Sequence, residues 1–148
     1  MYALLDAQNA YASMEEIFRP ALRKNPLCIA GSNDGCVISR NDHARRLGIK
    51  MSEPAFKLKA QQDMNRLMIL SANFELYSCV SLRMHSLLSG LSPSVFPYSI
   101  DEAFCDLQGI PGDHAQRIWS MRDRVKQWIG LEMGAGIAST PTLAKLAS

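Results

Sequence analysis

The sequence predicts an α+β protein in which one β-α-β-β-α-β unit is interrupted by an inserted lobe. Short apolar runs alternate with longer segments of helical periodicity along the 148 residues. Asp34-Gly35 separates two of the apolar runs and is a strong hairpin signal. A charge-rich stretch from about residue 11 to 70 separates the first apolar run from the remainder, and the inserted lobe is therefore expected there.

The first half of the chain carries clear start and stop signals. Pro20 ends the first helical segment because it lacks a backbone N–H. Asn41 or Asp42 can cap the second helix, which Gly48 ends. The stretch 52–66 is polar and irregular. The expected elements are a strand at 1–7, a helix at 11–18, strands at 26–31 and 36–40, a helix at 41–48 and a buried strand at 67–72.

The second half predicts two long helices, the remaining strands and a last helix. Asp113 is a helix cap, and Thr140 followed by Pro141 opens the last helix. The expected elements are a helix at 73–90, a strand through Asp101 that turns into a partner strand at 104–107, a helix at 113–130, a strand at 131–138 and a helix from 139. The residues expected to form the apolar faces of the two long helices are Tyr77, Val80, Met84, Leu87, Leu91, Ile118, Met121, Val125, Trp128 and Ile129.

The composition is that of a globular protein. Hydrophobic residues make up 47% of the chain and charged residues 20%, which is enough to bury a core. A formal net charge of only +2 does not by itself indicate a nucleic-acid partner. The four cysteines form no C-x-x-C pair, which argues against a zinc knuckle and indicates reduced thiols. With no basic leader and no apolar run of roughly 18 residues, no membrane association and a cytoplasmic location are expected.

Two adjacent acids, Asp101 and Glu102, interrupt an apolar run. The simplest explanation is exposure, because successive strand residues face opposite sides and one acid of such a pair usually faces water. A third acid, Asp6, ends the first strand. Mg²⁺ prefers a few carboxylates together with water and phosphate oxygens. The alternative explanation is therefore a site in which two Mg²⁺ ions bind a nucleoside triphosphate.

Several motifs along the whole chain together resemble the Y-family translesion DNA polymerases and, within them, the UmuC group. The matching pieces are ALLDAQNAYAS, FRPAL, SNDGCVISRN, RRLGIKM, NFELY, YSIDEAFCDL and GAGIASTPTLAKLA. The resemblance implies a ferredoxin-like βαββαβ palm with an inserted small α/β fingers subdomain. Palm would cover 1–10 and 73–148, fingers 11–72, and the thumb and little-finger domains of the family would be missing.

The resemblance also implies a metal site. Asp6 and Asp101 would bind both of two Mg²⁺ ions, and Glu102 would bind the ion nearest the primer terminus. The backbone carbonyl of Ala7 would complete the ligand set. Asp6, Asp101 and Glu102 are therefore the expected catalytic residues.

Three further residues match nucleotide-binding positions of the family. Tyr11 would be the steric gate that rejects a 2′-hydroxyl, Arg45 would reach the triphosphate, and Lys145 would lie near the substrate. Tyr11 at a helix start could instead be a packing residue, and Arg45 could pair with Asp42 on a helix surface.

The chain departs from the family pattern at three positions near the expected site. Gln8 stands where asparagine is usual and Ala10 where phenylalanine is usual, a change that would loosen the nucleotide pocket. Pro141 stands where a lysine is common, which removes one positive charge.

The implied function is error-prone, template-directed addition of dNTPs to a primer 3′-OH during SOS DNA damage tolerance. Partners of the full-length family are primer-template DNA, a UmuD′-type subunit, a recombinase filament and the sliding clamp. The 148-residue chain alone is expected to be inactive. The alternatives are a catalytically inert interaction module and, with motifs that fit less well, a nucleotidyl cyclase.

Overall fold

The computed structural model describes residues 1–148 and divides the chain into two compact units. Met1–Gln8 and Tyr77–Ser148 form the first, here called the sheet unit, and Asn9–Leu76 form the second, the inserted unit. The assignment of these units as palm and fingers, divided after residues 10 and 72, stays a prediction. None of the helices combines the length and the apolar character that a membrane crossing requires.

The sheet unit is built on a four-stranded antiparallel sheet with the strand order β5-β6-β1-β7. Its elements are β1 (Tyr2–Ala7), α4 (Phe74–Leu91, of which the first residues precede this unit), β5 (Val95–Pro97), β6 (Glu102–Asp106), α5 (His114–Trp128), β7 (Met133–Ala138) and α6 (Pro141–Ala147). Two helical crossovers and one hairpin connect the strands. The predicted α+β class and the β-α-β-β-α-β plan are confirmed.

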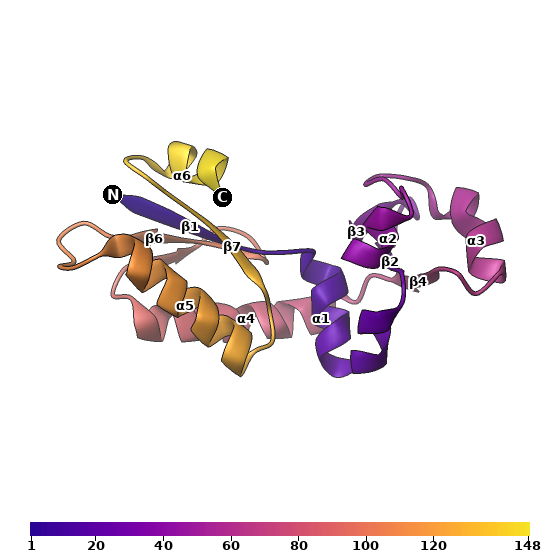
Figure 1. Ribbon diagram of the computed structural model, residues 1–148, viewed down its shortest axis with the longest axis horizontal. Coiled ribbons are helices and arrows are strands. Elements are labelled where there is room, and N and C mark those ends of the chain that lie inside the picture. Colours follow the sequence, from indigo (N-terminus) through magenta and orange to yellow (C-terminus); the bar gives the residue numbers. More distant parts are fainter. The chain divides into compact units, whose positions relative to one another are not determined.

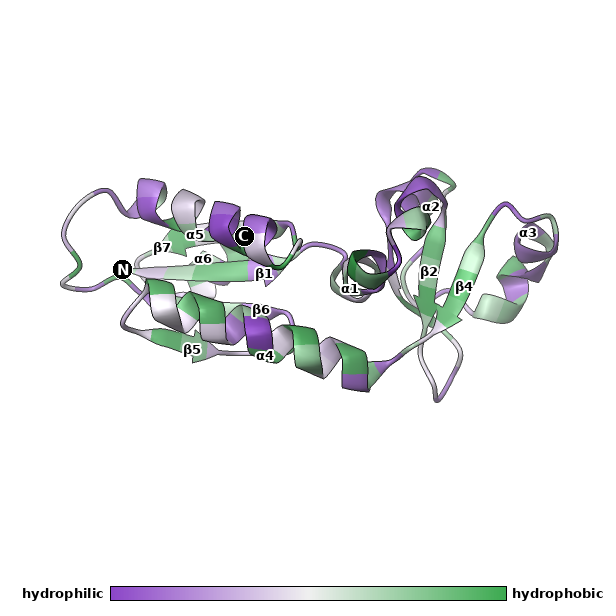
Figure 2. Cartoon of the chain, turned by 90° about the horizontal axis from the view of Figure 1, so that it is seen from below, coloured by the Kyte–Doolittle hydropathy of each residue, from purple (hydrophilic) through white to green (hydrophobic).

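Helices cover both faces of this sheet. Figure 1 shows α4 and α5 on one face and α6 on the other. Because β1 lies between the two layers, its residues Ala3, Leu4 and Leu5 are all fully buried, and Figure 2 shows the apolar character of this strand. Side chains of Val80, Met84 and their neighbours on α4 complete the core as the helical spacing predicts.

The inserted unit contains a three-stranded sheet of order β3-β2-β4. Its elements are α1 (Ala10–Phe18), η1 (Pro20–Lys24), β2 (Leu27–Ala30), β3 (Val37–Arg40), α2 (Asp42–Arg46), η2 (Ala55–Leu58), α3 (Lys59–Asp63) and β4 (Met68–Ser71). Strands β2 and β3 form the antiparallel hairpin predicted from Asp34-Gly35, with Gly35 at a φ of 65°. The core of the unit comprises Cys28, Val37, Ala44, Ile49, Leu58 and Leu67.

Three local expectations away from the acids were wrong. The stretch 52–66 was expected to be irregular but contains η2 and α3. The buried side chain of Leu58 anchors this polar segment to the core. Strand β4 lies at a sheet edge, and Met68 is 40% exposed, so this apolar run is only partly buried. Trp128 is 64% exposed at the end of α5, where the Arg124 guanidinium lies 5.3 Å from its ring.

Candidate functional site

The strand register of the sheet unit brings the expected acids together. Asp6 on β1 lies directly opposite Glu102 on β6. Directly opposed residues share a face of the sheet. The backbone N–H of Ala7 donates to the carbonyl oxygen of Asp101 at 2.9 Å, which ties the end of β1 to the turn before β6. Asp101 therefore lies in a turn and not in a strand as expected, but this turn places it beside Asp6 and Glu102.

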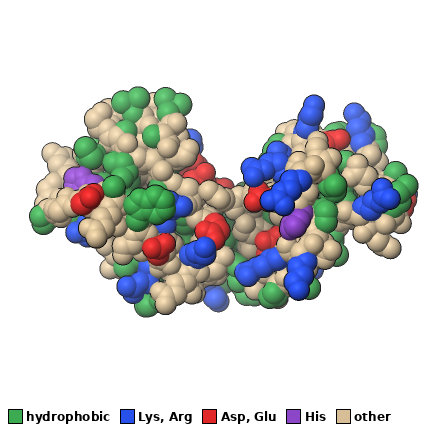
Figure 3. Space-filling model, in the orientation of Figure 1, with side chains coloured by type: hydrophobic (Ala, Val, Ile, Leu, Met, Phe, Trp, Pro, Cys, Tyr) green, Lys and Arg blue, Asp and Glu red, His purple; other side chains and the backbone are tan.

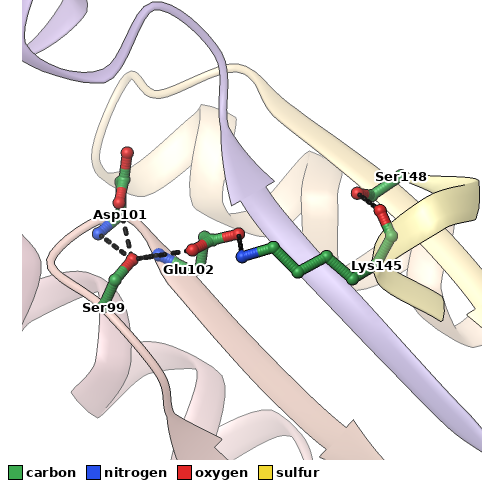
Figure 4. A network of polar contacts seen from close by, with 5 residues as sticks. All are labelled: Ser99, Asp101, Glu102, Lys145 and Ser148. Carbon is green, nitrogen blue, oxygen red and sulfur yellow. Dashed lines mark hydrogen bonds and ion pairs between the residues drawn. The ribbon is translucent and has the colours of Figure 1, made fainter. Parts of the chain in front are cut away.

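Ser99 connects the two adjacent acids (Figure 4). Its Oγ accepts the backbone N–H groups of Glu102 at 3.1 Å and Asp101 at 3.4 Å. Its hydroxyl lies 2.6 Å from Asp101 Oδ1 and 3.1 Å from Glu102 Oε2, and it can donate its single hydrogen to only one of them at a time. Both carboxylates are consequently turned toward one hydroxyl group, although their residues are neighbours in sequence.

The acids repel one another. Burial, followed by the negative charges of Asp101 and Glu102, raises the pKa of Asp6 from 3.8 to about 6, although the Lys145 ammonium group acts in the opposite direction. A raised carboxyl pKa means that the charged form lacks sufficient compensation. This end of the sheet is thus short of positive charge.

Lys145 on α6 supplies part of that charge. Its Nζ donates to Glu102 Oε1 at 2.8 Å and lies 4.5 Å from the centre of the Tyr98 ring. The hydrogen bond to Glu102 holds the pKa of Lys145 above its ordinary value. Of the seven site residues expected from the sequence, the sheet unit brings five together: Asp6, Ala7, Asp101, Glu102 and Lys145.

Gly136 lets α6 approach closely enough for this contact. Gly136 is a residue of β7 and pairs with Leu4 of β1, on the sheet face that α6 covers. A Cβ at this position would come within 2.2 Å of the carbonyl oxygen of Ala144 and 2.4 Å of the backbone nitrogen of Ser148. The helix therefore lies directly against the backbone of β7, and any larger residue would displace it.

A hollow of about 440 Å³ opens beside the Lys145 amine. It is mainly apolar, and its lining residues are Tyr98, Phe104, Pro141, Thr142, Lys145 and Leu146. The Tyr98 and Phe104 rings meet edge to face, with centroids 5.2 Å apart. The hollow can accept a flat or apolar group next to a fixed positive charge.

The carboxylates fit a hard cation by their chemistry but do not form a finished site. The structure contains no group of three or more His, Cys, Asp or Glu side chains that could hold a metal ion as they stand. Oxygen ligands suit Mg²⁺, and a divalent cation would offset the burial and the repulsion that together raise the pKa of Asp6. Two bound Mg²⁺ ions stay a prediction.

Tyr11 and Arg45 belong to the inserted unit. The Tyr11 ring meets Phe74 edge to face with centroids 5.7 Å apart. Arg45 forms an exposed ion pair with Asp42 at 2.7 Å, the pairing that the helix spacing allowed, and Asp42 also accepts from the Asn9 amide. Their roles toward a nucleotide stay predictions.

Basic side chains are prominent on the inserted unit. Figure 3 shows Lys and Arg side chains gathered over the face of this unit that is in view. The exposed bases between residues 40 and 66 are Arg45, Arg46, Lys50, Lys57, Lys59 and Arg66. The small net charge of the chain did not exclude a local basic surface, and the inserted unit carries one.

Sequence reasoning missed two polar residues of the site. Ser99 lies two positions before Asp101, a spacing that favours side-chain hydrogen bonds to the backbone of a turn and could have been noticed. His85, to which no chemistry was assigned, lies with Nε2 3.1 Å from the Ser99 carbonyl oxygen. No local pattern announces this contact, because it depends on how α4 packs against the turn.

Comparisons with known proteins agree with the fold and the motifs. Residues 5–148 match the model of the impB/mucB/samB family. The chain is 45% identical to the protein ImpB of Salmonella typhimurium, an alignment that covers 99% of this chain and 35% of ImpB. It is 43% identical to UmuC of Salmonella typhimurium, covering 100% of this chain and 36% of UmuC. It is 36% identical to DNA polymerase IV of Caulobacter vibrioides, covering 99% of this chain and 37% of the relative.

Solved structures share the fold. A post-insertion binary complex of Dbh DNA polymerase superposes with a TM-score of 0.86 at 24% identity, covering 98% of this chain and 44% of that one. DinB from Sulfolobus solfataricus superposes with a TM-score of 0.83 at 24% identity, again over 98% of this chain and 44% of the other. The chain spans about a third of the length of the curated relatives named above. The resemblance expected from the motifs is confirmed, and the chain belongs to the impB/mucB/samB family.

Proposed function

We propose that this chain is the palm-and-fingers part of an error-prone translesion DNA polymerase. The reaction would be template-directed addition of dNTPs to a primer 3′-OH. The observation that carries the proposal is the strand register that sets Asp6 opposite Glu102 with Asp101 in the adjoining turn, in a chain of this family. Relatives named UmuC and DNA polymerase IV support the same activity.

In this proposal the acids of the sheet unit hold two Mg²⁺ ions. Asp6, Asp101, Glu102 and the carbonyl of Ala7 would be the ligands. When bound, the ions would activate the attacking hydroxyl and neutralise the triphosphate. The raised pKa of Asp6 supports the assignment because it marks a place where negative charge exceeds its compensation. Lys145 would leave Glu102 when a cation arrives and would then be available for a phosphate oxygen.

The inserted unit would provide contacts to the incoming nucleotide. Tyr11 would act as the steric gate against a 2′-hydroxyl, with its ring supported by the edge-to-face contact with Phe74. Arg45 would bind the triphosphate, for which a planar guanidinium is well suited. Its ion pair with Asp42 is exposed and costs little to break.

Function in the cell would require more protein than this chain. Primer-template DNA would be the substrate, with a UmuD′-type subunit, a recombinase filament and the sliding clamp as partners in SOS damage tolerance in the cytoplasm. DNA affinity depends on many phosphate contacts. Since the relatives are about three times as long, the 148-residue chain alone would bind DNA weakly and would not extend a primer.

Carboxylate-to-amide substitutions in a version of the protein with the length of its relatives test this proposal. We expect Asp101→Asn and Glu102→Gln each to reduce primer extension at least about a thousandfold, because an amide removes the charge that holds the cation. Asp106→Asn is the matched control, since Asp106 lies on β6 opposite Tyr2 and away from the acids. Circular dichroism should show that all three variants fold. Full extension by either site variant would refute the assignment.

Sugar selectivity tests the gate. We expect Tyr11→Ala to raise ribonucleotide incorporation relative to deoxyribonucleotide incorporation by about tenfold or more, because truncating the ring removes the steric clash. Tyr11→Phe retains the ring and should retain the selectivity. Competing dNTP and rNTP incorporation on one primer measures the ratio, and an unchanged ratio in Tyr11→Ala would assign the gate to another side chain.

A catalytically inert interaction module is the second candidate. It is favoured by the lack of a finished three-ligand metal group and by the Lys145 ammonium at Glu102. Such a module would bind its partner proteins equally well after Asp101→Ala. It would also bind no Mn²⁺ at the acids in a calorimetric titration, whereas the polymerase proposal requires binding that Asp101→Ala abolishes.

A further inference from the structure

The turn that carries Asp101 is fastened to helix α4 by His85. The His85 side chain is buried, with 9% of the residue exposed, and its Nε2 lies 3.1 Å from the carbonyl oxygen of Ser99. A carbonyl oxygen only accepts, so Nε2 carries the hydrogen of this bond. Nδ1 of the same ring is buried without a hydrogen-bond partner. Burying the unpaired Nδ1 atom costs free energy of folding. The hydrogen bond from Nε2 to the Ser99 carbonyl is the polar contact that the buried ring makes.

Ser99 is held at each of its polar groups. Its backbone N–H donates to the carbonyl of Glu102 at 3.2 Å, and its carbonyl accepts from His85. Its hydroxyl lies between the Asp101 and Glu102 carboxylates (Figure 4). A shift of Ser99 would therefore move the hydroxyl that orients both acids.

The two ends of this short segment have separate anchors. The N–H of Ala7 on β1 holds the carbonyl of Asp101 at 2.9 Å. His85 on α4 holds the carbonyl of Ser99, two residues earlier. The hairpin also holds this segment, because the N–H groups of Tyr98 and Ser99 donate to the Glu102 carbonyl at 3.0 and 3.2 Å. His85 adds the bond to the Ser99 carbonyl, which fixes the peptide that follows Ser99.

We propose that His85 is a positioning residue for the acid cluster. By holding the Ser99 carbonyl it fixes the hydroxyl that aims the Asp101 and Glu102 carboxylates, so that they are ordered before a cation binds. The part of this inference that concerns the cation rests on the proposed function. Loss of a partner that orients ligands typically weakens metal binding by about 10- to 100-fold.

Amide hydrogen exchange of the metal-free 148-residue chain tests the ordering. The reporters are the N–H groups of Asp101 and Glu102, which donate to Ser99 Oγ. We expect His85→Met, which fills space without a donor, to speed their exchange by about tenfold, and His85→Gln, which keeps a donor, to stay within about threefold of the natural chain. The matched control is His114→Met, because His114 bonds the Ile110 carbonyl at 3.0 Å in the same unit. Unchanged exchange in folded His85→Met overturns the proposal.

A calorimetric Mn²⁺ titration of the same variants tests the consequence for the cation. His85→Met should weaken binding by about tenfold or more, with recovery in His85→Gln and no change in His114→Met. Faster exchange with unchanged Mn²⁺ affinity would overturn the role toward the cation. A natural chain that binds no Mn²⁺ would refute the proposed function, while the exchange result would still decide the role of His85.

A measurement on the natural chain covers the case in which His85→Met does not fold. Nuclear magnetic resonance should detect a slowly exchanging hydrogen on His85 Nε2, as a buried donor to a carbonyl requires. A rapidly exchanging Nε2 hydrogen, or a ring with hydrogen on Nδ1 alone, would overturn the proposal.

Discussion

Each unit of the protein has a polar centre, and the two centres are built on opposite principles. In the inserted unit, Asn41 is 6% exposed and fully satisfied. Its Oδ1 accepts from the backbone of Leu27 and Ala44, and its Nδ2 donates to Glu16 and to the Asn25 carbonyl. In the sheet unit, burial and the charges of Asp101 and Glu102 raise the pKa of the Asp6 carboxyl to about 6.

The difference separates stability from function. The buried amide of Asn41 connects β2, α1 and α2. It favours folding, because without its hydrogen bonds several polar groups would be unpaired. Carboxylates that repel one another oppose folding unless a cation neutralises them. Sites that conflict with folding are where functional chemistry is expected. The contrast predicts that substitutions at the two centres change stability in opposite directions.

Asn41→Ala should have the largest effect on stability. It removes four side-chain hydrogen bonds and leaves the Leu27 and Ala44 N–H groups unpaired, so we expect a loss of about 3–5 kcal/mol in the free energy of unfolding. Urea unfolding followed by circular dichroism measures this loss. Asn73→Ala, which removes one exposed bond to the Leu76 N–H, is the control and should cost about 1 kcal/mol. Equal losses in the two variants would show that Asn41 is not a structural centre.

Most of the fold could be predicted from the sequence because its signals are local. The Asp34-Gly35 turn specifies the β2–β3 hairpin, and Asp113 caps α5 by accepting from the N–H groups of Ala115 and Gln116. The failures occurred where burial depends on distant neighbours. The composition of the run containing Met68 would suit an edge strand or a central strand equally, so it could not show which of the two forms. Trp128 has the spacing of a core residue but lies at the exposed end of its helix.

The candidate site could be predicted in part for the same reason. Asp6 and Glu102 stood out because acids are rare in apolar strands. Their direct opposition follows from the β1–β6 register, which the sequence alone does not fix. The contact between His85 and Ser99 depends on tertiary packing and carried no signal.

Asp6→Asn should stabilise the protein, in contrast to Asn41→Ala. The folded chain keeps the Asp6 proton up to about pH 6, whereas the unfolded chain loses it near 3.8. Between these values the unfolded state binds fewer protons, so stability falls as pH rises, and the cost is fully present above about pH 6. Solvent screening of this partly exposed group reduces the cost to about 1 kcal/mol.

Urea unfolding between pH 4 and pH 7 measures this cost. Asp6→Asn should be more stable than the natural chain at pH 7 by about 1 kcal/mol and should lose the decline between pH 4 and pH 6. Asp106→Asn, at the other end of β6, is the control and should keep the decline. A less stable Asp6→Asn variant would mean that the Asp6 carboxylate contributes favourable contacts that outweigh its repulsion.

Lys145→Met should have the smallest effect of these substitutions. It tests whether the Lys145 ammonium group competes with a cation for Glu102 or holds Glu102 in place. The Lys145 ammonium occupies Glu102 at 2.8 Å, so it competes with any cation that binds there. Removing it should raise the affinity of the metal-free chain for Mn²⁺ by about threefold. Lys126→Met is the control, because Lys126 forms a more exposed pair with Glu132 at 2.6 Å in the same unit, away from the acids. A lower Mn²⁺ affinity in Lys145→Met would mean that the lysine holds Glu102 in its ligand position and does not compete for it.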